Sequence, residues 1–216
     1  MSALPAAVLQ GRFVRLEPLS LAHLPGLLAA ANGARDTFGF TNVPAGEAEM
    51  RAYVEEGAAR HAKGEALPFA TIDLRHGEPR VVGSTRFANA ERWSWPFGFE
   101  ADRPASIDAI EIGWTWLAPS AQRTAVNSEA KLLMLTHAFE AWRVLRVTLK
   151  TDARNARSRA AIERIGGKLD GVLRAHMPAF TGAAGEIRDT AIFSILRAEW
   201  PNVRERLEGF VAQRSA

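Results

Sequence analysis

Cysteine is absent from this chain of 216 residues, and its absence excludes several kinds of chemistry at once. Without a thiol the protein forms no disulfide, holds no metal through thiolates and has no cysteine nucleophile. No apolar run is long enough to span a bilayer, and the first residues lack the basic segment and long apolar core of a signal peptide. We therefore expect a cytoplasmic protein with neither a metal site nor a membrane partner.

An excess of charge of one sign is also lacking. The chain has 27 lysines and arginines against 24 aspartates and glutamates, and the arginines are dispersed. This balance does not indicate a nucleic-acid partner. There is no glycine-serine linker and no internal repeat, and 47% hydrophobic with 24% charged residues is ordinary for a globular protein. We expect residues 1–216 to fold as a single domain.

The chemical information is concentrated in residues 111–131, with the sequence EIGWTWLAPSAQRTAVNSEAK. Its first part is rich in Trp, Ile and Thr, which favour strands, and Pro119 cannot donate to a sheet ladder. A strand is therefore predicted to end near Leu117. After Val126, apolar residues recur at helical spacing until little polar face is left, which predicts a helix packed against a sheet.

Between this strand and this helix lies a loop of small residues with one arginine, Arg123. The first turn of a helix has backbone N–H groups without partners and carries a partial positive charge, so the position suits a phosphate. An alternative is that Asn127 or Ser128 simply caps the helix, because anion sites and ordinary caps use the same residues.

Hydrophobic periodicity and turn signals predict the other elements. Strands are expected at 13–17, 69–74, 81–87, 110–117, 145–151, 168–177 and 187–196. Helices are expected at 20–31, 47–63, after 126, at 152–165 and at 199–211. In the helix at 152–165, the arginines Arg154, Arg157 and Arg164 are expected to face solvent. A strand, a helix and a strand in immediate succession imply a parallel strand pair with a right-handed crossover.

Three motifs together resemble the GCN5-related N-acetyltransferase (GNAT) family, and within it the RimJ/RimL-like branch. They are EIGWTWLAPSAQRTAVNSEAKLLML, TDARNARSRAAIERIGGKLDGVLRAHM and RDTAIFSI, and the resemblance covers roughly residues 11–196. It implies the α/β (α+β) GNAT fold. That fold has a mixed, mostly antiparallel central sheet of about seven strands, helices on both faces, and a splayed parallel strand pair that binds the cofactor.

The resemblance also implies acetyl-CoA (CoA) as the cofactor. The strand before the loop would offer backbone groups to the pantetheine arm, the loop would hold the pyrophosphate, and an asparagine of the second motif would reach the pantetheine chain. The expected cofactor-binding residues are Trp116, Leu117, Gln122, Arg123, Thr124, Ala125, Val126, Asn127, Ser128 and Asn155.

Two features of this cofactor motif leave alternatives open. The chain has Ala125 and Asn127 at the glycine positions of the family motif, and alanine still permits a close backbone approach if φ is negative. A weakened cofactor site is the other interpretation of this departure. Asn155 is equally well explained as the cap of the helix that follows it.

The family's reaction needs a base, because an alkyl amine with a pKa near 10 is mostly protonated at neutral pH. Glu111 is the candidate, since it lies on the cofactor-binding strand, upstream of the pantetheine contacts. Alternatively, it is a carboxylate on an exposed strand face. Many family members place a tyrosine near the leaving thiolate, but that position is Ile162 here, so Ser158 is the remaining hydroxyl expected to serve the sulfur.

An aromatic segment at residues 92–99 has neither a helical nor a strand period. Its rings either cover the edge of the core, form a contact between two copies of the chain, or line a pocket. Because the segment lies just upstream of Glu111, we expect Trp93, Trp95 and Phe97 to form a wall of the acceptor pocket or a homodimer contact that shapes it.

These features predict an acetyl-CoA-dependent N-acetyltransferase, an acyltransferase that transfers an acetyl group directly to a primary amine within a ternary complex. The branch resemblance favours the α-amine of a peptide or protein, and a small-molecule amine stays open as the acceptor. The alternative is a GNAT-like module that binds acyl-CoA with little or no turnover. Ala125 and Ile162 favour this module, whereas Glu111, Asn155 and Ser158 argue against it.

Overall fold

The computed structural model describes residues 4–96, 107–180 and 185–213 of the chain. Within these residues, eight strands form one sheet in the order β1-β2-β3-β4-β5-β6-β8-β7. Neighbouring strands are antiparallel except β5 and β6, which run parallel. The strands are β1 (Leu9–Gln10), β2 (Val14–Pro18), β3 (Ala66–Asp73), β4 (Arg80–Glu91), β5 (Ala109–Leu117), β6 (Arg146–Asp152), β7 (Lys168–Pro178) and β8 (Ile187–Leu196).

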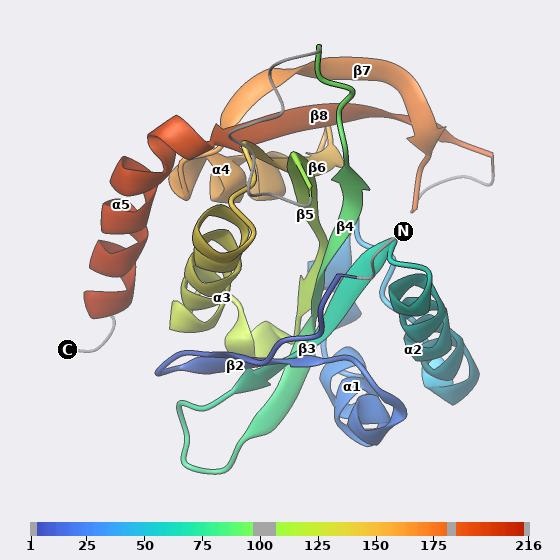
Figure 1. Cartoon of the computed structure of the whole chain (residues 1–216). Helices are drawn as coiled ribbons and strands as arrows, with labels where there is room; N and C mark the ends of the chain where they lie inside the picture. Colours follow the sequence, from blue (N-terminus) through green and yellow to red (C-terminus); the bar gives the residue numbers. More distant parts are fainter. Residues whose placement is uncertain (1–3, 97–106, 181–184, 214–216) are drawn as a thin grey trace.

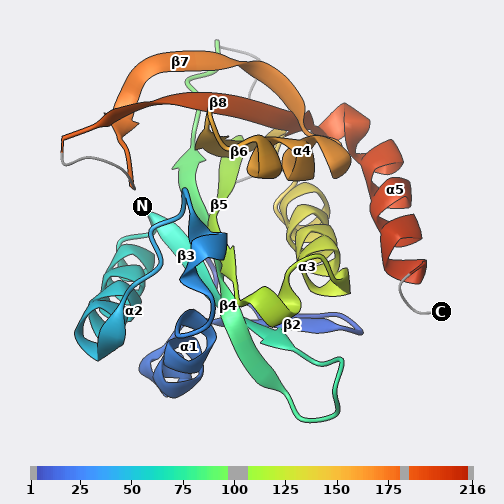
Figure 2. The ribbon, with the colours of Figure 1, turned by 180° about the vertical axis from the view of Figure 1, so that it is seen from behind.

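Helices cover both faces of this sheet, as Figure 1 and Figure 2 show from opposite sides. The helices α1 and α2 pack on one face against β4 and β3, and α3 lies on the other face with α5 beside it. Helix α4 contacts β6 and β7. Their bounds are α1 (Leu24–Ala31), α2 (Gly46–Ala62), α3 (Ala125–Thr136), α4 (Ala156–Arg164) and α5 (Trp200–Ala212).

The expected mixed sheet is confirmed, and each predicted element occurs, most of them with shifted ends. The extra strand is β1, which is too short at two residues to show any alternation. The helix expected over 20–31 begins with a 3-10 turn, Leu21–His23, before α1. The helix expected over 152–165 begins only at Ala156, because Asp152 still pairs with β8 as the end of β6.

The parallel pair β5 and β6 is joined over a short distance. Their register pairs Ala109 with Arg146, Ile110 with Val147 and Glu111 with Thr148, and no later pair follows. Beyond these pairs β5 stays bonded to β4 while β6 stays bonded to β8. The sheet therefore divides between β5 and β6, which is the splay expected from the family resemblance.

On its other edge, where it pairs with β4, β5 has a bulge. The register between β4 and β5 shifts between Ser84 and Arg86, and the backbone of Trp114 has a positive φ of 49°. An extra residue on one strand of an antiparallel pair bends that strand and increases its twist. The bulge thus helps to turn β5 away from β6.

Aromatic contacts fix β4 and β5 between the two helical layers. On the α3 face the ring of Phe87 lies 4.6 Å from that of Trp142, centroid to centroid. On the α1 and α2 face the ring of Trp116 meets Phe38 edge to face at 6.1 Å. Both strands are thus packed on their two faces, so the position of the gap between β5 and β6 is well determined.

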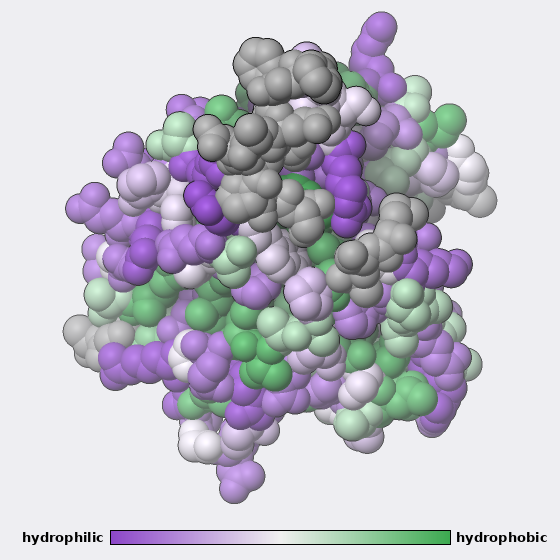
Figure 3. All heavy atoms as spheres, viewed as in Figure 1, coloured by the Kyte–Doolittle hydropathy of each residue, from purple (hydrophilic) through white to green (hydrophobic). Residues whose placement is uncertain are grey.

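The outer surface carries both hydrophilic and apolar side chains. In the view of Figure 3, apolar side chains form separate patches among hydrophilic ones rather than one continuous band. Among the described residues, the helices are all too short or too polar to cross a membrane.

Candidate functional site

Glu111 lies at the point where β5 and β6 separate, since its pairing with Thr148 is the last between the two strands. It is opposite Ala88 of β4, on the same face as Ser84, to which Tyr53 of α2 donates a hydrogen bond. The Glu111 side chain therefore points to the face that α1 and α2 cover. It is only 6% exposed, so the alternative of a carboxylate on an exposed strand face is wrong.

Two neighbours hold the Glu111 carboxylate through the same oxygen. Asn89 Nδ2 donates to Oε2 at 2.8 Å, and Lys150 Nζ forms an ion pair with Oε2 at 2.8 Å. The other oxygen, Oε1, accepts no hydrogen bond from a described residue. A Cβ at position 113 would lie 3.1 Å from it, so Gly113 keeps the space beside Oε1 open. The geometry leaves one fixed oxygen able to take a proton.

The backbone edge of β5 beyond Glu111 forms one side of the gap. Trp116 and Leu117 pair with β4 on one edge, but on the β6 side they have no partner strand among the described residues. Such an edge presents N–H and C=O groups that an extended ligand can pair with, as an added strand would. The structure thus brings Trp116, Leu117 and Glu111 to one opening in the sheet.

The loop that follows β5 closes one end of this opening. Gln122 Nε2 donates to the carbonyl of Leu117 at 2.8 Å, and Gln122 Oε1 accepts a hydrogen bond from Arg157 of α4. Arg123 has a left-handed backbone conformation with φ of 59°, which turns the chain toward α3. Gln122 therefore links β5 to α4 across the gap.

Thr124 is the residue that caps α3. Its Oγ1 accepts a hydrogen bond from the N–H of Val126 at 3.3 Å and donates one to the carbonyl of Ala121 at 2.7 Å. The interpretation that Asn127 or Ser128 caps the helix is therefore wrong, because α3 already begins at Ala125. Asn127 and Ser128 belong to the first turn.

That first turn combines small or buried side chains with free backbone donors. Ala125, Val126 and Ser128 are buried, whereas Asn127 is partly exposed. The N–H groups of a first helical turn have no acceptor within the helix, and Thr124 serves only one of them. The remaining donors and the helix dipole suit a bound anion, as the sequence predicts.

The start of α4 lies on the opposite side of the gap. Asn155 Oδ1 accepts from the N–H of Ser158 at 3.0 Å, so the interpretation of Asn155 as a helix cap is confirmed. The hydroxyl of Ser158 makes no hydrogen bond to a described residue, which leaves it available. Ile162, one turn later, is buried in the core.

Two arginines of α4 are exposed, as expected, and they also reach the predicted phosphate loop. Arg157 contacts Gln122, and Arg164 Nη2 donates to Ser128 Oγ at 3.1 Å. They are seven residues apart, which is two helical turns, so they share one face of α4. This spacing was a signal that sequence reasoning could have used to assign them to the site.

Lys150 and Asn89 were also missed, and here the sequence carries no comparable signal. Lys150 lies two residues beyond the partner of Glu111 on β6, so only the strand register places its side chain on the same face. Asn89 has a positive φ of 52° at the irregular end of β4. Both become visible as partners of Glu111 only in the folded chain.

The aromatic segment is tied to the beginning of β5. Trp93 N–H and Trp95 Nε1 donate to the two carboxylate oxygens of Asp108 at 2.8 and 3.2 Å, and the two indole rings lie 6.0 Å apart. Asp108 is three residues before Glu111, so these rings lie at the Glu111 end of β5. Phe97 lies outside the described residues.

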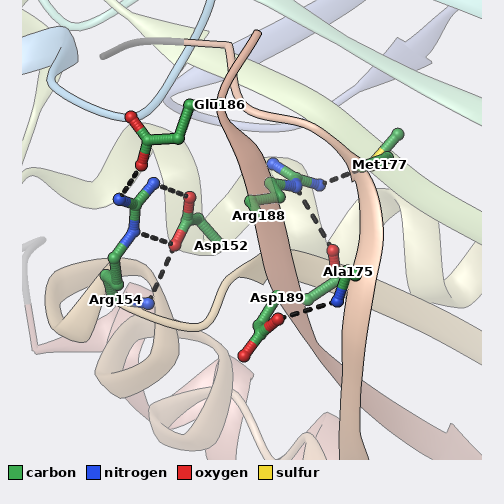
Figure 4. Close-up of polar contacts among 8 residues, drawn as sticks. Asp152, Arg154, Ala175, Met177, Glu186, Arg188 and Asp189 are labelled. Atoms are coloured by element: carbon green, nitrogen blue, oxygen red, sulfur yellow. Dashed lines mark hydrogen bonds and ion pairs between the residues drawn. The ribbon is translucent and has the colours of Figure 1, made fainter. Parts of the chain in front are cut away.

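A second polar network lies at the end of β6 and the start of β8 (Figure 4). Arg154 pairs with both Asp152 and Glu186, and its hydrogen bonds hold the pKa of the Asp152 carboxyl below its usual range. Arg188 points away from them and donates to Met177 Sδ and to Thr190 Oγ1. Burial lowers the pKa of Arg188, with Asp152 and Glu111 opposing that shift. Arg188 therefore lies close enough to both Asp152 and Glu111 to be influenced by their charges.

Lys131 is a buried cation on the other face. Its Nζ donates to Thr115 Oγ1 at 2.8 Å and to Thr85 Oγ1 at 3.3 Å, with no carboxylate partner among the described residues. Burial lowers the pKa of Lys131 to about 7. Over the described ranges, histidine and carboxylate side chains nowhere gather into a group of three or more that could hold a metal.

Comparison with known proteins agrees with this geometry. Residues 14–168 match the family model described as "Acetyltransferase (GNAT) domain". No curated protein sequence matches the chain significantly.

Solved structures resemble the chain over nearly its whole length. A GCN5-related N-acetyltransferase from Brucella melitensis is 30% identical, with 97% of this chain and 87% of that chain covered and a TM-score of 0.77. A protein from T. thermophilus designated a candidate acetyltransferase is 32% identical, with 97% and 98% covered and a TM-score of 0.72. RimJ of Mycobacterium smegmatis, crystallised with CoA-disulfide, is 20% identical, with 98% and 94% covered and a TM-score of 0.70, which shows a shared fold.

Proposed function

Because the chain belongs to the GNAT acetyltransferase family, we propose that it transfers an acetyl group from acetyl-CoA directly to a primary amine in a ternary complex. The observation that carries this proposal is the position of Glu111. Its carboxylate lies at the apex of the gap between β5 and β6, held by Lys150 and Asn89, with Oε1 unoccupied by any described donor. A fixed proton acceptor at the opening of the cofactor site is what amine acetylation requires.

The residues around the gap fit acetyl-CoA. The free edge of β5 at Trp116 and Leu117 would bind the pantetheine amides, and the first turn of α3 would bind the pyrophosphate. Arg157 and Arg164 add positive charge beside that turn. Asn155 would reach the pantetheine chain with its amide Nδ2, which has no described partner. When bound, acetyl-CoA supplies the activated acetyl group.

Glu111 acts on the acceptor amine. An ammonium is not nucleophilic, so Oε1 takes its proton directly or through a water molecule. Lys150 and Asn89 hold the carboxylate by Oε2, which fixes the direction of Oε1 during this step. Gly113 leaves the space that the amine needs beside Oε1.

The hydroxyl of Ser158 donates a hydrogen bond to the departing sulfur. Its hydroxyl is free of described hydrogen bonds and lies in the first turn of α4, next to the cap Asn155. A thiol with a pKa of about 8.5 leaves readily as the anion, so the hydroxyl has only to donate a hydrogen bond. The buried Ile162 has no group that could take this role.

The acceptor proposal follows from the motifs and the aromatic segment. The RimJ/RimL-like motifs support the α-amine of a peptide or protein, with small amines as the second class. Trp93 and Trp95, anchored by Asp108, would form the acceptor wall near Glu111, either in one chain or at a homodimer contact.

A screen of amine acceptors with acetyl-CoA, followed by released thiol, tests the proposal. Turnover should depend on Glu111 and persist in Glu55→Gln, a matched change of an exposed carboxylate on α2. Acetyl-CoA binding by calorimetry without thiol release for any acceptor would identify a CoA-binding module instead. Absence of both binding and turnover in the folded protein would contradict the proposal.

A further inference from the structure

Arg86 is a buried guanidinium beside the candidate base. It lies on β4 opposite Gly113 of β5 and is 1% exposed. Ala88, two residues further along β4, is opposite Glu111, so Arg86 and Glu111 share the face of the sheet that α1 and α2 cover. Diagonal neighbours of this kind have Cα atoms about 7–8 Å apart.

Two aromatic rings hold the guanidinium, which forms no hydrogen bond with the part of the chain that the structure describes. Its carbon lies 5.1 Å from the ring centroid of Tyr53 and 5.1 Å from that of Trp114. Nε and Nη2 are buried and have no hydrogen-bond partner among the described residues. Cation–π contacts satisfy the faces of the planar group, whereas its N–H donors lie in the plane and still need acceptors. Buried unsatisfied donors are costly, and a structure that keeps them needs a reason.

No described carboxylate on this face is available to Arg86. Glu111 is paired with Lys150, and Asp152 is paired with Arg154. Arg188, the other buried guanidinium of the face, bonds only to Thr190 and Met177 among the described residues. Among the described residues, this face thus has more guanidinium groups than carboxylates left to pair with them. A planar anion from outside would satisfy Nε and Nη2 together.

We propose that Arg86 binds a carboxylate of the acceptor, so that the acceptor carries an amine and a carboxylate a few bonds apart. This inference rests on the proposed acetyltransferase function. The diagonal spacing of Arg86 and Glu111 sets the length: with the carboxylate at Arg86, a short aliphatic chain brings the amine to Oε1. Tyr53 and Trp114 are both partly exposed and form the wall between the guanidinium and the solvent, so one ring turns aside to admit the ligand.

Tyr53 is the better fixed of these two rings. Its hydroxyl donates to Ser84 Oγ at 2.9 Å, which in turn donates to the carbonyl of Phe69 at 2.9 Å. The side chain of Trp114 makes no hydrogen bond to a described residue, and Trp114 lies on the bulge with φ of 49°. The entrance to Arg86 is therefore on the Trp114 side, toward β5 and the base.

The first experiment compares acids with their amides as acceptors. Glycine is compared with glycinamide and β-alanine with β-alaninamide, and peptides with N-terminal Asp are compared with peptides with N-terminal Asn. Wild-type kcat/KM should be at least about tenfold higher for the acid than for its amide, either among the amino acids or among the peptides. The class that shows this preference indicates whether the acceptor carboxylate belongs to a free amino acid or to a peptide side chain. Arg86→Met should lose this preference, and Arg86→Lys should keep part of it. Arg12→Met, which removes an exposed arginine stacked on Phe13, should keep it entirely.

The second experiment needs no turnover and so separates this inference from the proposed function. Binding of the N-acetylated acids and N-acetylated amides to the CoA-loaded protein is measured by calorimetry, together with melting temperatures. We expect tighter binding of the acids, lost in Arg86→Met, while its melting temperature is kept or raised because an unpaired buried charge is removed. Equal affinity or equal kcat/KM for acids and amides would overturn the inference, even in an active acetyltransferase. The inference would also be overturned if the melting temperature of Arg86→Met were lowered and both Arg86 variants retained the preference for the acid.

Discussion

The two sides of the gap between β5 and β6 are built in different ways. On the proposed cofactor side, the edge of β5 that lacks a described partner strand, the loop and the first turn of α3 follow one another in residues 116–128. On the proposed acceptor side, Arg86, Asn89, Glu111 and Lys150 come from three strands and meet only through the register of the sheet. Apart from the residues of α4, the first side is local in sequence, whereas the second is assembled by the fold.

This difference extends to the chemistry of the two sides. Within residues 116–128 the proposed cofactor side offers mainly backbone N–H groups, which any residue in the same conformation supplies. The acceptor side offers particular side chains with particular partners. Substitutions on the cofactor side should therefore act through added bulk or charge, and those on the acceptor side through the loss of a functional group.

The largest effect is expected on the acceptor side from Glu111→Gln. The amide cannot take a proton at Oε1, so turnover should fall about a hundredfold or more, while acetyl-CoA affinity changes little. Steady-state thiol release from pH 6 to 9, with calorimetry of acetyl-CoA, measures both. Wild-type turnover across this range would assign the base to another group.

On the cofactor side, Asn127→Glu should weaken acetyl-CoA binding by about a hundredfold. Its partly exposed side chain would place a negative charge where the pyrophosphate is expected, and like charges brought together cost several kcal/mol. Asn127→Ala is the matched control and should bind nearly as the wild type does. Equal calorimetric affinity of the Glu and Ala variants would remove this turn from the cofactor site.

Lys131→Met tests how the buried charge of Lys131, beneath β5, affects the free energy of unfolding. The pKa of Lys131 is lowered to about 7 from 10.5, so the folded state binds fewer protons than the unfolded state between these values. Wild-type stability therefore rises with pH through this window, and the cost of the charge is complete below about pH 7. Lys131→Met should raise the free energy of unfolding by about 1–4 kcal/mol at pH 7 or below.

The gain from Lys131→Met should shrink as the pH approaches 10, because neutral lysine no longer carries that cost. Urea unfolding of both proteins at pH 6, 8 and 10 gives the three differences. A constant difference across these values would show that the charge of Lys131 is not the cause.

Ser158→Ala should give the smallest effect, a few-fold loss of kcat, because a thiolate leaves with little help. Its backbone N–H still bonds to Asn155, so α4 should keep its cap and the melting temperature should not change. A loss as large as that of Glu111→Gln would instead make the hydroxyl essential to the proton transfers.

Much of the fold was accessible from the sequence because its signals are local. Alternating residues identified β2 and β6, and the Trp, Ile and Thr content identified β5. Pro119 and the apolar spacing after Val126 marked the strand, loop and helix of the proposed cofactor side. The cap of α3 was misplaced because Thr124, Asn127 and Ser128 are all good capping residues, and only the backbone conformation selects Thr124.

The sequence by itself determined every element except β1, their order, and the strand, loop and helix proposed to bind the cofactor, since hydrophobic period and turn chemistry act over a few residues. Only the tertiary structure decided what Glu111 touches. Its burial, the contact of Lys150 and Asn89 with one oxygen, and the position of Arg86 on the same face depend on strand register. A one-residue change of register would turn each of these side chains to the opposite face, so no local pattern could have specified them.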